Sequence, residues 1–374
     1  MLLDSPGNDF GQRRRSLTER MHIDGPLMFG LLVLIVTSLF VLYSTSGQSI
    51  DVLLRQILRF GLAIVLLLVL AQTQPAHLRR WAPWFFFVGV VLLIIVLVMG
   101  QIGKGAQRWL DLGLFRFQPS EIMKLAVPMM VAWFLSETSL PPKKRHVALC
   151  LVIILVPVFL IAKQPDLGTS ILVASAGIFA LYFAGIRWTL IAAFATVAAA
   201  STPIIWHFMR DYQRQRVLTM LNPESDPLGT GYHIIQSKIA IGSGGTYGKG
   251  WLNGTQSQLN FLPESSTDFI FAAYAEEFGL FGVLLLMLIY LFILVRGLLI
   301  AAQAQDTFTR LLAGSLIMTF FIYVFVNIGM VTGLLPVVGV PLPLVSYGGT
   351  SVVTLMASFG ILMSIHTHRK LLPR

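Results

Sequence analysis

Long stretches without a charged residue dominate this sequence, and the longest runs from Leu311 to His368. Its 58 residues far exceed the roughly 20 that one helical membrane crossing needs. Three prolines and several glycines interrupt the run between Gly333 and Gly349. The stretch therefore predicts two membrane helices, joined by a segment that can enter the membrane only where protein or a cavity covers its backbone.

The composition excludes an ordinary water-soluble enzyme. Only 12% of the residues are charged and 56% are hydrophobic, with a mean hydropathy of +0.77, whereas soluble domains are about 25% charged. The other apolar runs that predict spans are 27–46, 53–72, 82–101, 119–136, 147–163, 169–186, 188–209 and 270–295. We therefore expect an all-α polytopic membrane protein of about ten transmembrane helices, with one membrane domain over residues 25–368 and polar ends at 1–24 and 369–374.

Residues 211–268 form the one long polar interval, between the seventh and eighth predicted spans. Nine charged residues and eight glycines prevent it from crossing hydrocarbon as a continuous span. Isoleucines between Ile234 and Ile241 indicate a short amphipathic helix that ends in the glycines at 242–245. We predict a large structured loop rather than a flexible tether.

The distribution of charge predicts which side each end occupies. With both termini inside, 15 of the 27 basic residues are cytoplasmic, as the positive-inside rule favours. The loop 211–268 is then exterior, and many of the acidic residues gather at the same edge. The net charge of +10 is spread over short loops, which argues against a nucleic-acid partner. Cys150 is the only cysteine, so an intrachain disulfide framework is excluded.

Asp268 is the first candidate for chemistry, because it precedes the eighth span at the exterior boundary. A carboxylate there can be partly desolvated, still reach water and abstract a proton from a sugar hydroxyl. The alternative is an acid that only complements the helix dipole. Glu276 and Glu277 lie deeper, where we expect them to partner buried polar groups or to face a wet cavity.

The segment 101–124 supplies a second group of candidates. Glu121 and Lys124 are three apart on a helix that Pro119 starts, so they share a face and can neutralise each other. A purely structural ion pair explains them as well. Lys104, Arg108, Arg116 and Trp109 add cations and an interfacial aromatic residue where an anionic lipid headgroup would lie. Such a cluster can hold a diphosphate.

Asp166 is a third acid at the same face, and it is equally compatible with a simple N-cap for the sixth span. The glycine-rich stretch 242–250 does not match a nucleotide loop, because Gly250 replaces the required Ser or Thr after Lys249. His366 and His368 lack an acidic or cysteine companion, so the sequence predicts no metal site there.

Several long segments, in order along nearly the whole chain, resemble the shape, elongation, division and sporulation family of bacterial cell-wall polymerases. They are KGAQRWLDLG at 104–113, RFQPSEIMK at 116–124, KQPDLGTSI at 163–171, the stretch 212–245, FLPESSTDFIFA at 261–272, AEEFGL at 275–280 and the stretch 327–349. The sequences of the segments 164–170 and 212–245 favour the elongation branch of the family over the division branch.

The resemblance implies a peptidoglycan glycosyltransferase that polymerises lipid II at the periplasmic face of the bacterial inner membrane and releases undecaprenyl diphosphate. It implies Asp268 as the essential carboxylate, which we expect to act as general base in an inverting displacement. Further site residues by resemblance are Glu121, Lys124 and Asp166, with Arg108, Trp109 and Arg116 as contacts for diphosphate or sugar. A divalent cation, Mg²⁺ or Mn²⁺, could assist the leaving group, although no metal motif is visible.

The resemblance also implies partners: a class B penicillin-binding protein that crosslinks the glycan, and other components of the elongation complex. Two other functions fit the residues alone. A lipid II flippase needs a polar cavity inside an apolar bundle, and a non-catalytic scaffold could activate the transpeptidase without performing chemistry.

Overall fold

The computed structural model describes residues 21–103, 106–111, 116–209, 211–226, 229–259 and 261–369. The predicted polar ends therefore fall largely outside the described residues, as does Lys104. The elements are α2 Gly25–Thr45, α3 Ile50–Gln72, α4 Pro75–Met99, β1 Gln101–Gly103, β2 Ala106–Asp111, β3 Arg116–Phe117, α5 Pro119–Ser136, α6 Lys144–Lys163, α7 Leu167–Phe183, α8 Trp188–Phe208, α9 Asp211–Leu221, a 3-10 turn Pro223–Ser225, α10 Thr230–Gly244, α11 Thr255–Gln258, α12 Ile270–Ala302, α13 Thr307–Val331 and α14 Thr350–Thr367.

Helices occupy all ten positions where the sequence predicts spans. Seven in the described part are long and apolar enough to cross a membrane: α2, α3, α4, α6, α12, α13 and α14. α7, with 17 residues, is shorter. A helical multi-pass membrane protein is therefore confirmed.

Local signals set the helix ends. Pro75 and Pro119 occupy the first position of α4 and α5, where a missing N–H costs nothing. Asp24 accepts the N–H of Leu27 at 2.9 Å to cap α2, and Asp306 caps α13 in a reciprocal capping box. The start of α4 at Pro75 corrects the expected 82–101, because proline starts the helix before the apolar run begins.

A small three-stranded antiparallel sheet, in the order β1-β2-β3, corrects the expectation of a purely helical chain. It lies between α4 and α5, where the apolar run ends and Gly103 and the following polar residues break the helical pattern. The sheet places β2 against α4 and α5. It therefore covers the end of the bundle at which the candidate site residues lie.

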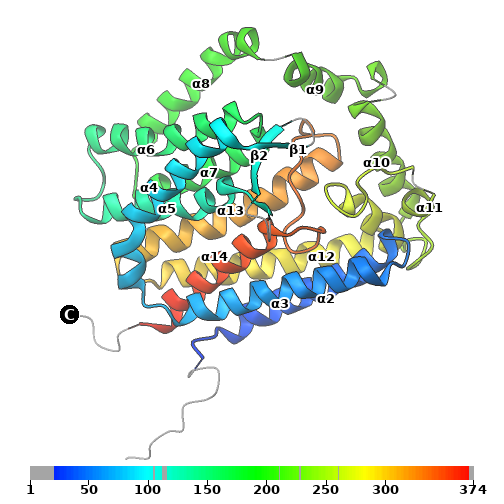
Figure 1. The fold of residues 1–374 in the computed structure, drawn as a ribbon, viewed down its shortest axis with the longest axis horizontal. Coiled ribbons are helices and arrows are strands. Elements are labelled where there is room, and N and C mark those ends of the chain that lie inside the picture. Colours follow the sequence, from blue (N-terminus) through cyan, green and yellow to red (C-terminus); the bar gives the residue numbers. More distant parts are fainter. Residues whose placement is uncertain are drawn as a thin grey trace, which may run out of the picture.

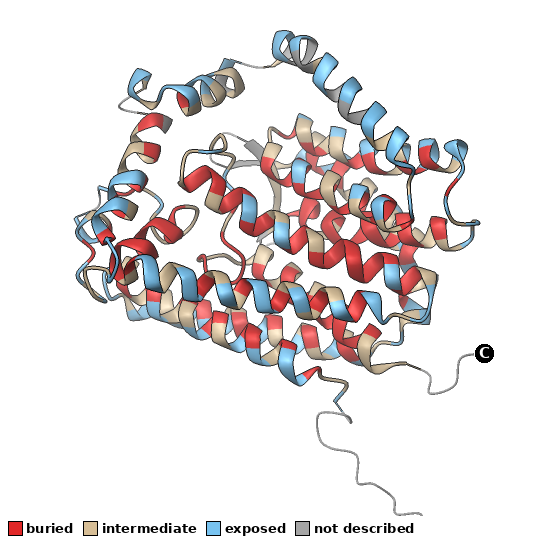
Figure 2. Cartoon of the chain, turned by 180° about the vertical axis from the view of Figure 1, so that it is seen from behind, coloured by how far each residue is buried: buried red, intermediate tan, exposed pale blue. Residues whose placement is uncertain are grey.

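Packing within the bundle is close where glycine lines the contact. α3 lies along α14, and a Cβ on Gly360 would lie 2.6 Å from the carbonyl oxygen of Leu67, so only glycine allows this approach. Figure 1 shows α8 and α9 arching away from the other helices. Figure 2 shows the buried residues concentrated in the central helices rather than in that arch.

The two ends of the described chain meet at one end of the bundle. The rings of His22 and His368 stack with centroids 4.1 Å apart, and Arg296 of α12 donates to both carboxylate oxygens of Asp24, at 3.0 and 2.5 Å. Burial raises the pKa of Asp24, but its hydrogen bonds to Arg296 and to the Leu27 N–H outweigh this and lower it overall. The stacked histidines thus bring residues 22 and 368 to the same end of the bundle.

The long interval is structured, and its loop 245–250 pairs with a break in α12. Gly279 has φ +63°, and around it the N–H groups of Lys249 and Gly250 donate to the carbonyl oxygens of Glu276 and Glu277 at 3.0 and 2.9 Å. The Glu276 carboxylate accepts from Lys249 Nζ at 2.6 Å, and Glu277 accepts from Ser44. Glu277 thus partners a buried polar group, as predicted, whereas Glu276 pairs with the partly exposed Lys249.

Candidate functional site

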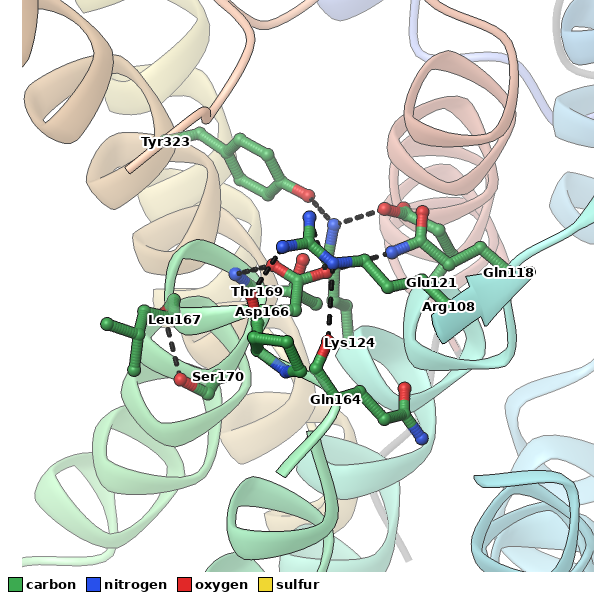
Figure 3. Close-up of polar contacts among 11 residues, drawn as sticks. Arg108, Gln118, Glu121, Lys124, Gln164, Asp166, Leu167, Thr169, Ser170 and Tyr323 are labelled. Carbon is green, nitrogen blue, oxygen red and sulfur yellow. Dashed lines mark hydrogen bonds and ion pairs between the residues drawn. The ribbon is translucent and has the colours of Figure 1, made fainter. Parts of the chain in front are cut away.

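A buried ion pair forms the first part of the candidate site. Lys124 Nζ lies 2.5 Å from Glu121 Oε1, one turn away on α5, and also donates to the hydroxyl of Tyr323 on α13. Glu121 and Lys124 are each 5% exposed and Tyr323 is 1% exposed. The other carboxylate oxygen of Glu121, Oε2, has no hydrogen-bond partner among the described residues. Figure 3 shows this cluster between α5 and α13.

Asp166 forms the second part and has two roles. Its Oδ1 accepts the N–H of Thr169 at 3.2 Å, which confirms that it caps α7. Its Oδ2 accepts from Gln118 Nε2 at 3.0 Å and lies 3.7 Å from Arg108 Nη1. Arg108 also donates to the carbonyl oxygens of Gln164 and Pro165. This network joins β2, the start of α5 and the start of α7 (Figure 3).

Asp268 lies in the turn before α12 and is half-buried. Its carboxylate packs against Gly339, where a Cβ would lie 3.4 Å from Oδ2. The neighbouring Val338 and Val340 pack on Gly168, two residues beyond Asp166. Asn327 donates to the backbone carbonyl of Asp268 at 2.9 Å and lies one turn, about 6 Å, along α13 from Tyr323. The three acids therefore converge at one end of the bundle.

A groove of about 1210 Å³ opens beside this cluster, between α3, α4, α5 and α14. Arg59, Arg108 and Glu121 line one end, and Leu66, Leu70, Phe85 and Leu125 line much of the rest. A second pocket of about 430 Å³ shares Leu70, Phe85 and Leu125 with it and is bounded by Trp81, Trp84 and Ile361. The two pockets are therefore adjacent, the larger with charged residues in its lining and the smaller with an apolar lining.

The predicted site residues take different places around the groove. Of those that the structure describes, Glu121, Arg108 and Trp109 line it, whereas Lys124, Asp166 and Asp268 do not. Lys124 and Asp166 contact lining residues from the interior. Arg116 pairs with Asp111 in the sheet, and its side chain lies outside the described residues.

Sequence reasoning missed Arg59, Gln118, Tyr323 and Asn327. Arg59 carried a usable signal, because an ionisable residue within an apolar run is a candidate for function by default. Its guanidinium lies 4.4 Å from the ring centroid of Tyr347. Tyr323 and Asn327 also follow a pattern, since polar residues four apart in an uncharged run share one helix face.

A metal ion has no ready protein cage here. In the part of the chain that the structure describes, no three His, Cys, Asp or Glu side chains gather as a metal site needs. Glu121 pairs with Lys124, and Asp166 pairs with Gln118 and Arg108.

Comparison with known proteins decides the family. A family model described as cell cycle protein, covering FtsW, RodA and SpoVE, matches residues 21–371. The chain belongs to this family. It is 56% identical to the peptidoglycan glycosyltransferase MrdB of Escherichia coli, over 96% of this chain and 98% of that one. It is 33% identical to the stage V sporulation protein E of Bacillus subtilis, over 94% and 99%.

Solved structures share the fold. One, of a peptidoglycan synthase complex that coordinates polymerization and crosslinking, has 31% identity and a TM-score of 0.81, covering 93% of this chain and 99% of that one. The rod shape determining protein RodA of Thermus thermophilus has 26% identity and a TM-score of 0.70, covering 93% and 98%. These relatives confirm the predicted family and the predicted class, a peptidoglycan glycosyltransferase.

Proposed function

We propose that the groove and the adjoining acids are the site at which this chain polymerises lipid II. The 4-hydroxyl oxygen of the acceptor sugar attacks the anomeric carbon of the donor, and the bond from that carbon to the diphosphate oxygen breaks. Asp268 takes the hydroxyl proton, and undecaprenyl diphosphate leaves. One displacement inverts the anomeric centre and needs no covalent intermediate with the protein.

The observation that carries the proposal is the polarity of the groove. Its apolar end suits a polyprenyl tail, and Arg59 and Arg108 at its other end suit a diphosphate. Lys124 is less suited to that task, because its side chain is only 6% exposed, whereas the Arg108 side chain, although also hydrogen-bonded, is 33% exposed. The arginines therefore stabilise the charge that develops on the leaving group.

The charged end of the groove also borders the turn that carries Asp268. Arg59 stacks on Tyr347, and the backbone N–H of Tyr347 donates to the carbonyl oxygen of Ser266 at 2.8 Å. Tyr347 thus links the proposed diphosphate site at Arg59 to the turn that carries the proposed base. Glu121 also lines this end of the groove, although its Oε2, which is unpaired among the described residues, is itself buried.

Blocking the groove should test the proposal. Leu66 lines it from α3, so Leu66→Trp should raise the KM for lipid II at least tenfold by filling the space for the tail. Ile57 lies nine residues earlier, on the opposite face of the same helix, and is 43% exposed. Ile57→Trp is the matched control and should leave KM within about twofold, measured as glycan formation by purified protein in lipid vesicles.

The same vesicles separate an enzyme from a transporter. Glycan polymer formed from lipid II supports the proposal, and translocation of lipid II across the bilayer without polymer would overturn it. If Leu66→Trp forms polymer normally with an unchanged KM, the chain is still a polymerase, but the groove is not where it binds lipid II.

We further propose ten membrane crossings, with both termini cytoplasmic and the interval 211–268 periplasmic. The positive-inside bias and the meeting of His22 with His368 support this arrangement. Tyr247 is 81% exposed in that interval, so Tyr247→Cys should react with a membrane-impermeant thiol reagent in intact spheroplasts. Reaction only after lysis would reverse the orientation.

A class B penicillin-binding protein is the partner we propose, together with other elongation components. Support comes from the synthase complex that shares this fold; co-purification of the two proteins from membranes tests it.

We propose that a divalent cation, Mg²⁺ or Mn²⁺, binds mainly through the diphosphate, since that ion commonly uses one or two carboxylates plus phosphates. Calorimetry should then detect the ion only with the diphosphate present.

A further inference from the structure

The backbone carbonyl groups of residues 266, 267 and 268 each accept a hydrogen bond. The donors lie on α13 or on the segment that connects α13 to α14. The Ser266 carbonyl accepts from the backbone N–H of Tyr347 at 2.8 Å. The Thr267 carbonyl accepts from Ser346 Oγ at 2.6 Å, and the Asp268 carbonyl accepts from Asn327 Nδ2 at 2.9 Å. We call these three contacts the carbonyl clamp.

Asn327 and Ser346 each join the clamp to a second segment. Asn327 Nδ2 also donates to the carbonyl oxygen of Val340 at 2.7 Å, so both amide hydrogens are used. Ser346 Oγ also accepts the N–H of Leu342 at 2.7 Å. The two side chains are 0% and 2% exposed, so water cannot replace these bonds.

We infer that Asn327 and Ser346 are positioning residues for Asp268, which they hold through its backbone without touching its carboxylate. The inference rests on the proposed role of Asp268 as base. The turn at 264–269 is short, its Glu264 has φ +52°, and its internal backbone hydrogen bonds run from the N–H groups of Thr267 and Phe269 to the single carbonyl oxygen of Glu264. A displacement of about 1 Å in a catalytic group can lower a rate about 10²-fold, and the clamp is what prevents such a displacement.

The sequence offers a matched pair of serines for the test. Ser346 and Ser38 are both buried, and each donates its hydroxyl to a backbone carbonyl. Ser38 binds Val345 at 2.8 Å, so it anchors the α13–α14 connection without contacting the Asp268 turn. Ser346→Ala and Ser38→Ala therefore each remove a hydroxyl-to-carbonyl bond made with this connection, and only the first opens the clamp. Ser346→Ala also removes the acceptor of the Leu342 N–H.

We expect Ser346→Ala to lower kcat for glycan polymerisation roughly tenfold with the KM for lipid II within twofold, because substrate binding is unchanged while the base is less well placed. Ser38→Ala should keep kcat within twofold. Ser346→Thr restores the hydroxyl and should recover most of kcat. Asn327→Asp, which presents an oxygen to two carbonyls, should lose more than Ser346→Ala.

Amide hydrogen exchange supplies a readout that does not depend on activity. In Ser346→Ala, exchange should quicken in peptides that cover 264–272, and in Ser38→Ala it should not. Faster exchange with unchanged kcat would overturn the inference, as would equal losses of kcat in both serine variants. Full activity in Asp268→Asn would instead refute the proposed role of Asp268, so the two failures are distinguishable.

Discussion

Replacing Asp268 by Asn is expected to lower the rate of lipid II polymerisation by about 10²–10⁴-fold, the usual contribution of a general base. Asparagine keeps the size of the side chain and cannot take the proton of the acceptor hydroxyl. The backbone carbonyl of residue 268 still accepts from Asn327, so the fold should persist. Purified protein with lipid II, assayed by the length and amount of glycan formed, measures the effect.

The control for this variant is Asp211→Asn. Asp211 lies at the start of α9 in the same interval, and its side chain is fully exposed. It should retain the parent rate and the parent melting temperature. Glycan synthesis by Asp268→Asn at the parent rate would contradict the assignment and would favour a scaffold that supports its transpeptidase partner without chemistry.

Replacing Lys124 by Met is expected to lower the free energy of unfolding by about 3–5 kcal/mol, because it leaves the Glu121 carboxylate buried without its cation. Polymerisation should fall with it. The double variant Glu121→Leu/Lys124→Met removes both charges and should recover most of the lost stability. If the pair serves the reaction, the double variant will stay inactive; thermal unfolding in detergent and the glycan assay separate the two effects.

The double variant decides between the two interpretations of this ion pair. A stable and active double variant would show that Glu121 and Lys124 are structural. Inactivity at normal stability would assign the ion pair, whose Glu121 lines the groove, a role in the reaction. Ser315→Ala is a control for the loss of one buried hydrogen bond elsewhere on α13. Ser315 donates its hydroxyl to the carbonyl oxygen of Ala176 on α7.

Periodicity and composition predicted the helices, because lipid leaves a chain few alternatives to helices for its backbone polar groups. The Glu121–Lys124 pair could also be predicted from the sequence, since residues three apart on a helix share a face. The hydrogen bond between Lys124 and Tyr323 could not be predicted in this way, because it joins α5 to α13 and depends on how distant helices pack. For the same reason no local pattern predicted that Asn327 binds the backbone of Asp268.

The irregular segments mark the limit of sequence reasoning. The sheet around Arg108 was not predicted, because strands of two to six residues carry too little pattern to recognise. The pairing of the loop 245–250 with α12 follows from the break at Gly279, which a sequence shows only as one more glycine in an apolar run. Of the two, the sheet carries the site residue Arg108.

The apolar pocket bounded by Trp81, Trp84 and Ile361 carries a consequence for turnover. In the proposed reaction this lining contacts only the polyprenyl tail, which is identical on the incoming donor and on the spent carrier, so this part of the binding energy does not change as the reaction proceeds. The spent carrier is therefore a natural product inhibitor. Steady synthesis then depends on how fast other enzymes withdraw that carrier from the surrounding bilayer.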